Sequence, residues 1–103
     1  MIVVTRIPTH RNDGSKISEA EITRILDRVR KKFRGYSYEG PSYGAWVAAD
    51  GAVYEERSFR LEVVVPPEKV KAVQMHFRKI GKQLGQRAIY MEVREGGEIV
   101  DLE

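Results

Sequence analysis

The chain has 103 residues, of which 42% are hydrophobic and 32% charged, and its formal net charge is +3. This length fits one domain, 1–103, and the absence of cysteine excludes disulfides and thiolate metal sites. No segment has the roughly 20 apolar residues that span a bilayer and the first residues lack a signal-peptide pattern, so we expect a cytoplasmic protein.

The first third of the chain predicts a strand followed by a helix. Residues 2–7 are rich in β-branched side chains, which favour a strand. Ser18 and Glu21 form the pattern of a capping box that begins a helix over 19–34. Its apolar face is marked by residues spaced three and four apart: Ile22, Ile25, Leu26, Val29 and Phe33. Gly35 is predicted to end this helix in the left-handed conformation.

A β-hairpin is predicted in the middle of the chain. Residues 36–44, rich in Tyr, Gly, Ser and Pro, are interpreted as a connection. Residues 45–49 and 53–65 are predicted strands. Asp50-Gly51 between them is typical of a two-residue turn in which both residues have positive φ.

The last third predicts a second helix and a long strand. Apolar residues at helical spacing predict a helix over 67–84: Val70, Val73, Phe77, Ile80 and Leu84. Alternating apolar and polar residues over 89–94 predict a strand. Gly96-Gly97 then predicts a turn into a short return strand at 99–102, an extra C-terminal hairpin.

The element order is therefore β-α-β-β-α-β. Each helix has a single apolar stripe, so both must cover the same face of an antiparallel sheet. This is the ferredoxin-like α+β arrangement, a two-layer sandwich. Because many unrelated functions occur on this fold, the fold by itself predicts none of them.

A set of short motifs in this order resembles one family of small bacterial proteins, grouped as a domain of unknown function. The motifs are Asp13-Gly14, the run from Ile17 to Glu21, the run from Phe33 to Ser37, Gly44-Ala45-Trp46, Asp50-Gly51-Ala52-Val53 with Glu56, and Gly85-Gln86. The resemblance covers about residues 1–94 and implies the same ferredoxin-like fold. It implies no activity.

The histidines and glycines form no recognised catalytic or cofactor motif. Neither His10 nor His76 lies in a motif that pairs it with Ser and Asp in a catalytic triad. The two histidines belong to different elements, so they lack the spacing of metal ligands. The glycines match neither a Walker loop nor a dinucleotide fingerprint. We therefore expect no metal and no cofactor.

The aromatic connection and the strand after the hairpin are the best candidates for a ligand site. Tyr36, Tyr38 and Trp46 can form a cleft with Glu56 and Arg57, in which Glu56 would be the weak candidate for acid–base catalysis. The alternative is that Glu56 is an exposed strand residue paired with a cation on the next strand.

The face of the sheet opposite the helices is the best candidate for an interface. Alternation places Val4, Val64 and Tyr90 away from the helices, where a strand that faces water should be polar. The alternative is that scattered apolar residues are tolerated in the open. We therefore expect a homodimer formed through this face.

Three functions follow, in order of preference. The first is a homo-oligomeric module that binds a small molecule or a partner; the second is an enzyme acting on a small substrate through Glu56. A buried Glu56 with a raised pKa favours the enzyme, and a solvent-paired one favours the module. The least favoured is nucleic-acid binding through the basic helix faces, formed by Arg24, Arg28, Lys31, Lys71, Arg78 and Lys82.

Overall fold

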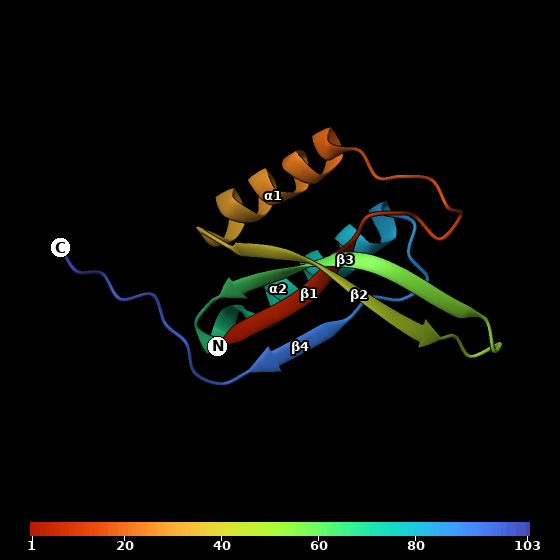
Figure 1. Cartoon of the computed structure of the whole chain (residues 1–103). Helices are drawn as coiled ribbons and strands as arrows, with labels where there is room; N and C mark the ends of the chain where they lie inside the picture. Colours follow the sequence, from red (N-terminus) through yellow and green to blue (C-terminus); the bar gives the residue numbers. More distant parts are fainter.

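The computed structural model describes all 103 residues and contains four strands and two α-helices. In chain order these are β1 (Ile2–Pro8), α1 (Glu19–Phe33), β2 (Ser37–Val47), β3 (Val53–Val64), a 3-10 turn (Pro67–Lys69), α2 (Val70–Gln83) and β4 (Met91–Arg94). The order β-α-β-β-α-β confirms the prediction (Figure 1). Neither helix is long and apolar enough to cross a lipid bilayer.

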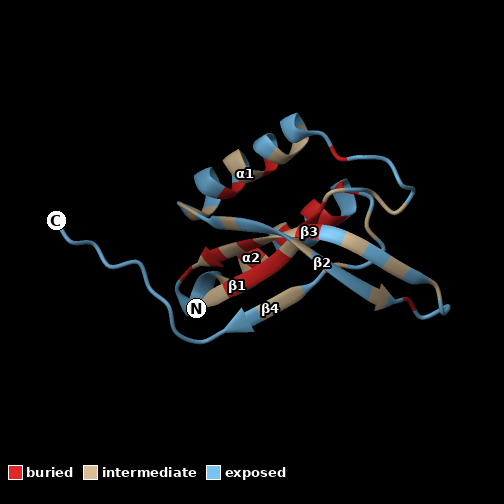
Figure 2. Ribbon diagram, in the orientation of Figure 1, coloured by how far each residue is buried: buried red, intermediate tan, exposed pale blue.

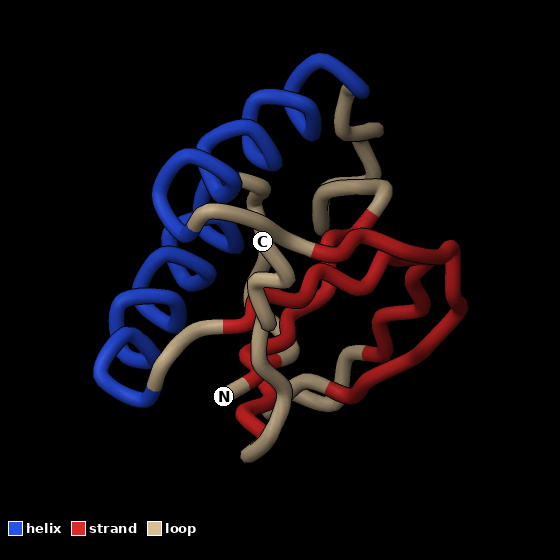
Figure 3. The backbone as a smooth tube through the Cα atoms, turned by 90° about the vertical axis from the view of Figure 1, so that its left-hand side faces the viewer, coloured by secondary structure: helices blue, strands red, loops and turns tan.

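The four strands form one antiparallel sheet in the order β2-β3-β1-β4. Neighbours in the sheet are mostly not neighbours in sequence, because each helix returns the chain across the sheet. Both helices lie on the same side of the sheet, as Figure 3 shows edge-on. The fold is therefore the expected ferredoxin-like two-layer sandwich.

The core lies between the helices and the two central strands (Figure 2). The apolar stripes of both helices contribute to it, together with alternate residues of β1 and β3. Its buried members are Val3, Ile7, Ile17, Ile25, Val29, Leu61, Val63, Val65, Val73, Phe77, Ile80 and Leu84. Every second residue of β1 and β3 faces the other way, so the remaining residues of these strands form the open face of the sheet.

The start of α1 agrees with the predicted cap only in part. Ser18 Oγ accepts a hydrogen bond from the Glu21 N–H at 3.1 Å, as expected. The Glu21 carboxylate does not accept the second hydrogen bond of a capping box, from the Ser18 N–H, because it binds the Arg11 guanidinium instead. At the other end Arg34, not Gly35, has the left-handed conformation, with φ of 71°. The helix thus ends one residue earlier than predicted.

The connection predicted at 36–44 is wrong: these residues belong largely to strand β2. Ser37 pairs with Glu62 and Ala45 with Glu55, and the register shifts between Glu39 and Ser42. Gly40-Pro41 lies within this irregularity, on a strand at the edge of the sheet. Proline removes a ladder donor and is tolerated at such an edge, so the turn-like composition is compatible with a strand.

The hairpin between β2 and β3 exists, but its loop is longer than two residues. The Gly51 N–H donates to the Ala48 carbonyl at 2.9 Å, and the Ala48 N–H donates to Ala52. Of the predicted turn pair only Gly51 has positive φ, at 85°. This is a type I turn followed by a left-handed glycine, the usual alternative for a three-residue loop.

The last strand is shorter than predicted, and the C-terminal hairpin is absent. Ile89 lies outside β4 and packs against α2 at Gly81, where a Cβ atom would overlap the Ile89 side chain. Residues 95–103 form no strand and leave Ile99 and Leu102 exposed. A pair of such short strands makes too few contacts to offset the entropy of ordering the chain.

The two faces of α2 yield the first prediction. Phe77 is 1% exposed at the centre of the core, whereas Met75 is 61% exposed. Phe77→Ala should lower the free energy of unfolding by about 3–5 kcal/mol because it leaves a cavity. Met75→Ala should cost less than about 1 kcal/mol. Urea denaturation of both variants measures the difference, and equal losses would contradict the placement of α2.

Candidate functional site

The structure has two main hollows, one on each side of the β2–β3 hairpin. The first, here called the helix-side cleft, has a volume of about 990 Å³ and lies between that hairpin, the segment 8–17 and the first turns of α1. The second, here called the open-face pocket, has a volume of about 420 Å³. It lies on the sheet face opposite the helices and is lined by Arg6, Ser42, Tyr43, Gly44, Ala45, Trp46, Glu56, Ser58, Ala88, Ile89 and Tyr90.

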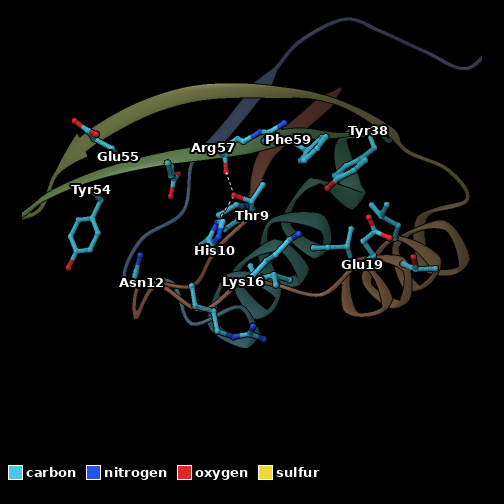
Figure 4. Close-up of a pocket in the computed structure, with 18 of the residues that line it drawn as sticks. Thr9, His10, Asn12, Lys16, Glu19, Tyr38, Tyr54, Glu55, Arg57 and Phe59 are labelled. Carbon is cyan, nitrogen blue, oxygen red and sulfur yellow. Dashed lines mark hydrogen bonds between the residues drawn. The ribbon is translucent and has the colours of Figure 1, made fainter.

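The helix-side cleft is wide, and many of its polar groups already have partners (Figure 4). Tyr38 stacks on Phe59 with ring centroids 5.0 Å apart, and burial raises the pKa of Tyr38 to about 12. The Thr9 N–H and hydroxyl both donate to the Arg57 carbonyl, at 2.9 and 3.2 Å. The Thr9 hydroxyl also lies 2.8 Å from His10 Nδ1. These contacts join the hairpin to the loop before α1.

Trp46 forms one wall of the open-face pocket, and the surrounding loops hold its ring in place through Tyr54. Trp46 and Tyr54 are cross-strand partners, and their rings stack with centroids 4.7 Å apart. Arg87 Nη1 donates to the Tyr54 hydroxyl at 3.0 Å and to Asp50 Oδ2 at 3.1 Å. The Arg87 N–H in turn donates to Asn12 Oδ1 at 2.6 Å. The Trp46 ring is therefore positioned before any ligand arrives.

The opposite wall carries a positive charge from Arg6 of β1. Arg6 Nη1 donates to Ser42 Oγ at 2.8 Å, and its guanidinium carbon lies 5.4 Å from the centroid of the Tyr90 ring. The Tyr90 hydroxyl donates to Glu92 Oε2 at 2.5 Å, which fixes the ring. Arg6 takes part in none of the ion pairs of the structure. Its charge is available to an anion in the pocket.

Glu56 supplies the negative charge of the open-face pocket. Its side chain is half-buried and forms no ion pair and no hydrogen bond within the protein. Burial raises the pKa of Glu56, and the nearby charge of Arg6 opposes that rise. The pocket thus contains a carboxylate and a guanidinium that face the same space without pairing.

The structure brings together only some of the predicted ligand-site residues. Trp46 and Glu56 share the open-face pocket. Tyr38 and Arg57 line the helix-side cleft, to which Glu56 also contributes, and Tyr36 lines neither hollow. Successive residues of a strand point to opposite faces, so Arg57 does not reach the open-face pocket of Trp46, and only Glu56 borders both hollows. The predicted single cleft is therefore two sites.

Arg6 and Ser42 are among the residues of the open-face pocket that were not predicted. Arg6 is the one charged residue of β1, and this signal is present in the sequence. Its partner Ser42 lies 36 residues away and was assigned to a connection. Only the register of β1, β3 and β2 brings the two together.

The predicted interface residues differ in how far they are exposed. Val4 is fully buried within a single chain, because it lies in register between Glu62 and Glu92, whose longer side chains share its face. Val64 is half-buried and Tyr90 is 46% exposed. Two ion pairs also lie on this face: Arg60 with Glu62 at 3.1 Å and Arg94 with Glu92 at 2.5 Å. The expectation that Val4 is available to a partner is wrong.

Comparison with known proteins supports the fold. A phage SAM lyase in complex with S-methyl-5′-thioadenosine aligns over 94% of this chain and 92% of its own, with a TM-score of 0.65 and 13% identity. A structure of a phage SAM lyase in its apo state aligns over 94% of this chain and 91% of its own, with a TM-score of 0.63 and 13% identity. A designed ferredoxin-fold protein aligns over 99% and 90% at 20% identity, with a TM-score of only 0.36. At 13% identity the likeness to the two phage SAM lyase structures shows a shared fold alone. No protein-family model matches the chain, and no curated protein does.

The raised pKa of Glu56 predicts how stability depends on pH. The folded state holds the Glu56 proton more tightly than the unfolded chain, so the contribution of Glu56 to the free energy of unfolding falls as pH rises from the ordinary glutamate range through the folded pKa. Glu56→Gln removes this loss. Its stability relative to the native chain should therefore be higher at about pH 8 than at about pH 4.

Urea denaturation at the two pH values measures this difference. Glu55→Gln, on the exposed neighbouring residue of the opposite strand face, is the matched control. If the stability of Glu56→Gln relative to the native chain is the same at both pH values, the Glu56 carboxyl is not desolvated and the prediction is wrong.

Proposed function

We propose that this protein binds a small molecule in the open-face pocket, and that the ligand combines a flat ring with one positive and one negative group. The observation that carries the proposal is the arrangement of Glu56 and Arg6, which face one pocket without forming an ion pair, beside the rings of Trp46 and Tyr90. Few convergent polar groups among aromatic side chains are typical of ligand sites.

Each wall of the pocket suits one part of such a ligand. A guanidinium binds a carboxylate through charge-assisted hydrogen bonds, and Arg6 keeps donors free besides the one that binds Ser42. The Glu56 carboxylate attracts a cation, and a half-buried charge without a partner gains most from such an ion. The Trp46 ring offers a face for stacking. The volume of about 420 Å³ lies in the range of small-molecule pockets.

The fold likeness suggests which ligands to test first. S-adenosylmethionine, the SAM of the phage enzyme's name, carries an adenine ring, a sulfonium cation and an amino-acid group with both charges. S-methyl-5′-thioadenosine, the molecule bound to that enzyme, keeps the ring and lacks these charges. The pair therefore separates recognition of the ring from recognition of the charges.

A second candidate function is acid–base catalysis by Glu56 on the bound molecule. The observation that favours it is the raised pKa of a half-buried Glu56 that has no ion-pair partner. A raised pKa brings a carboxyl group closer to the range in which it both accepts and donates protons at neutral pH. The criterion derived from the sequence is a buried Glu56 with a raised pKa. Glu56 has the raised pKa but is half-buried, so catalysis stays the second candidate.

Self-association across the open face remains part of the proposal. With Val4 buried, Val64 and Tyr90 are the predicted residues that a second copy can still contact. Tyr90 also lines the open-face pocket, so a second copy on this face would cover the pocket. A pair related by two-fold symmetry presents the same surface twice.

Binding is tested by calorimetric titration of the chain with SAM and with S-methyl-5′-thioadenosine. SAM should bind, and Arg6→Ala and Glu56→Gln should each weaken it about tenfold, the usual effect of removing one charged partner. The thioadenosine should bind more weakly and be insensitive to Arg6→Ala. Glu55→Gln is the control. Absence of SAM binding at millimolar concentration, or binding that Glu56→Gln leaves unchanged, contradicts the proposed site.

Catalysis is tested in the same samples by chromatography of SAM after incubation. If Glu56 is an acid–base residue, the native chain converts SAM and Glu56→Gln loses at least about a hundredfold in rate, the lower range of general acid–base catalysis. Binding without conversion supports the module and rejects catalysis on this substrate.

Sedimentation equilibrium at micromolar concentration tests self-association. The native chain should have the mass of a dimer, and Val64→Lys should reduce it to a single chain while far-ultraviolet circular dichroism stays unchanged, because each dimer would bury the introduced charge twice. A native mass of 11.8 kDa, that of one chain, would reject pairing across the open face.

A further inference from the structure

The helix layer carries an excess of positive charge that the proposed ligand pocket does not use. α2 has no acidic residue, and in the second half of α1 Asp27 is the one acid. Asp27 pairs with Arg30 at 2.6 Å and with Lys31 at 2.9 Å. The remaining basic residues of the two helices take part in no ion pair: Arg24, Arg28, Lys32, Lys71, Arg78, Lys79 and Lys82.

Four basic side chains gather where the two helices lie side by side. We call this group the basic seam: Arg28 and Lys32 of α1 with His76 and Lys79 of α2. The two helices meet through the rings of Phe33 and His76, whose centroids are 5.5 Å apart in an edge contact. Lys32 Nζ lies 5.7 Å from the Phe33 ring. Burial lowers the pKa of His76, and the charges of Lys32, Lys79 and Arg28 lower it further. All three cations are therefore close enough to His76 to affect its protonation.

The free protein does not balance the charge of the basic seam. Arg24, Arg28 and Lys32 are spaced by four residues on α1, and like charges at this spacing repel each other. The net charge of +3 understates the positive charge of residues 1–94, because residues 95–103 contain four acidic residues and no cation. That segment extends away from the end of β4 (Figure 1). A bound anion would relieve the repulsion.

The surroundings of the basic seam indicate the kind of anion. Helices that lie on a membrane combine cations with large exposed apolar residues, and on α1 and α2 Met75 is the one such residue. A small free anion needs a concave site, and no residue of the basic seam lines either main hollow. Exposed cations along two adjacent helices suit an extended polyanion instead.

We propose that the helix layer is a sequence-independent binding surface for the phosphate backbone of nucleic acid, centred on the basic seam. We expect no sequence preference, because exposed Lys and Arg side chains bind the phosphates that every sequence presents. With three permanent cations at the seam, the logarithm of the affinity for a single strand should fall with the logarithm of salt with a slope of about −2. Between about 50 and about 200 mM salt this amounts to a loss on the order of tenfold.

The first experiment measures fluorescence anisotropy of a labelled single-stranded DNA of about 20 nucleotides, longer than a typical single-strand site, titrated with the full chain. Lys32→Glu combined with Lys79→Glu should lower the affinity at least about tenfold. The matched control combines Lys16→Glu with Lys69→Glu, which changes the net charge equally at exposed cations outside α1 and α2. It should retain most of the affinity. Circular dichroism verifies that both double variants fold.

The second experiment uses the two histidines as internal probes in proton NMR. Bound phosphates favour the imidazolium form, so the DNA should raise the pKa of His76 and leave the signals of His10, in the loop before α1, unchanged. Equal loss of affinity in both double variants, or DNA binding that does not affect His76, overturns the proposal. So does binding to anionic phospholipid vesicles without binding to DNA. Because the pocket lies on the opposite side of the sheet, Glu56→Gln should not affect DNA binding.

Discussion

The antiparallel pairing of β1 with β3 determines which side chains belong to the core and which belong to the pocket. Val3 pairs with Val63 and Arg6 with Arg60, so the first pair faces the helices and the second faces the open side. A shift of one residue in this register would place Arg6 against α2 and bring Val4 into the core. The burial of Val3, Ile7 and Leu61 under the helices excludes that shift. The register between β1 and β3 therefore determines both which residues form the core and which line the pocket.

The hairpin that extends beyond β1 creates room for a site. β1 ends at Pro8, opposite Ser58, while β2 and β3 stay paired as far as Val47 and Val53. Beyond Pro8 this two-stranded arm has no central strand beside it, and hollows remain on both of its sides. Arg87, Asp50 and Asn12 then tie the arm to the loops around it. An arm held in this way can keep an aromatic wall in place without a packed core behind it.

The sheet separates two surfaces with different charge. On the open face Arg60 pairs with Glu62 and Arg94 with Glu92, whereas Arg6, Glu39 and Glu56 form no ion pair. Of these three unpaired charges, Arg6 and Glu56 line the pocket. On the helix layer the cations are largely unpaired. An unpaired half-buried charge lowers stability, and natural proteins retain such groups mainly where function needs them. The unpaired charges of the pocket and the unpaired cations of the helix layer therefore lie where we place the two binding functions.

Local patterns were sufficient to predict the two helices, the order of the elements and the fold class. The helical stripes of Ile25 and Val29 and of Val73 and Phe77 are set by spacing within one helix, and both stripes are buried as expected. The Ser18 cap likewise depends on residues three apart. Composition misled the prediction at residues 36–44, because an edge strand accepts Gly and Pro that a central strand would not. Residues 99–102 show the converse: a strand pattern remains unstructured when no neighbouring strand stabilises it.

The site itself depends on the tertiary structure. From the sequence alone Trp46 and Glu56 could be singled out, since an aromatic and a carboxylate beside a hairpin are chemically suggestive. Their separation from Arg57 and Tyr38, and their meeting with Arg6 and Tyr90, follow from strand register and from which face the helices cover. Those are contacts between residues tens of positions apart, such as Arg6 with Ser42. Periodicity shows that a residue faces one side of its own strand; only the pairing of strands decides what stands opposite it.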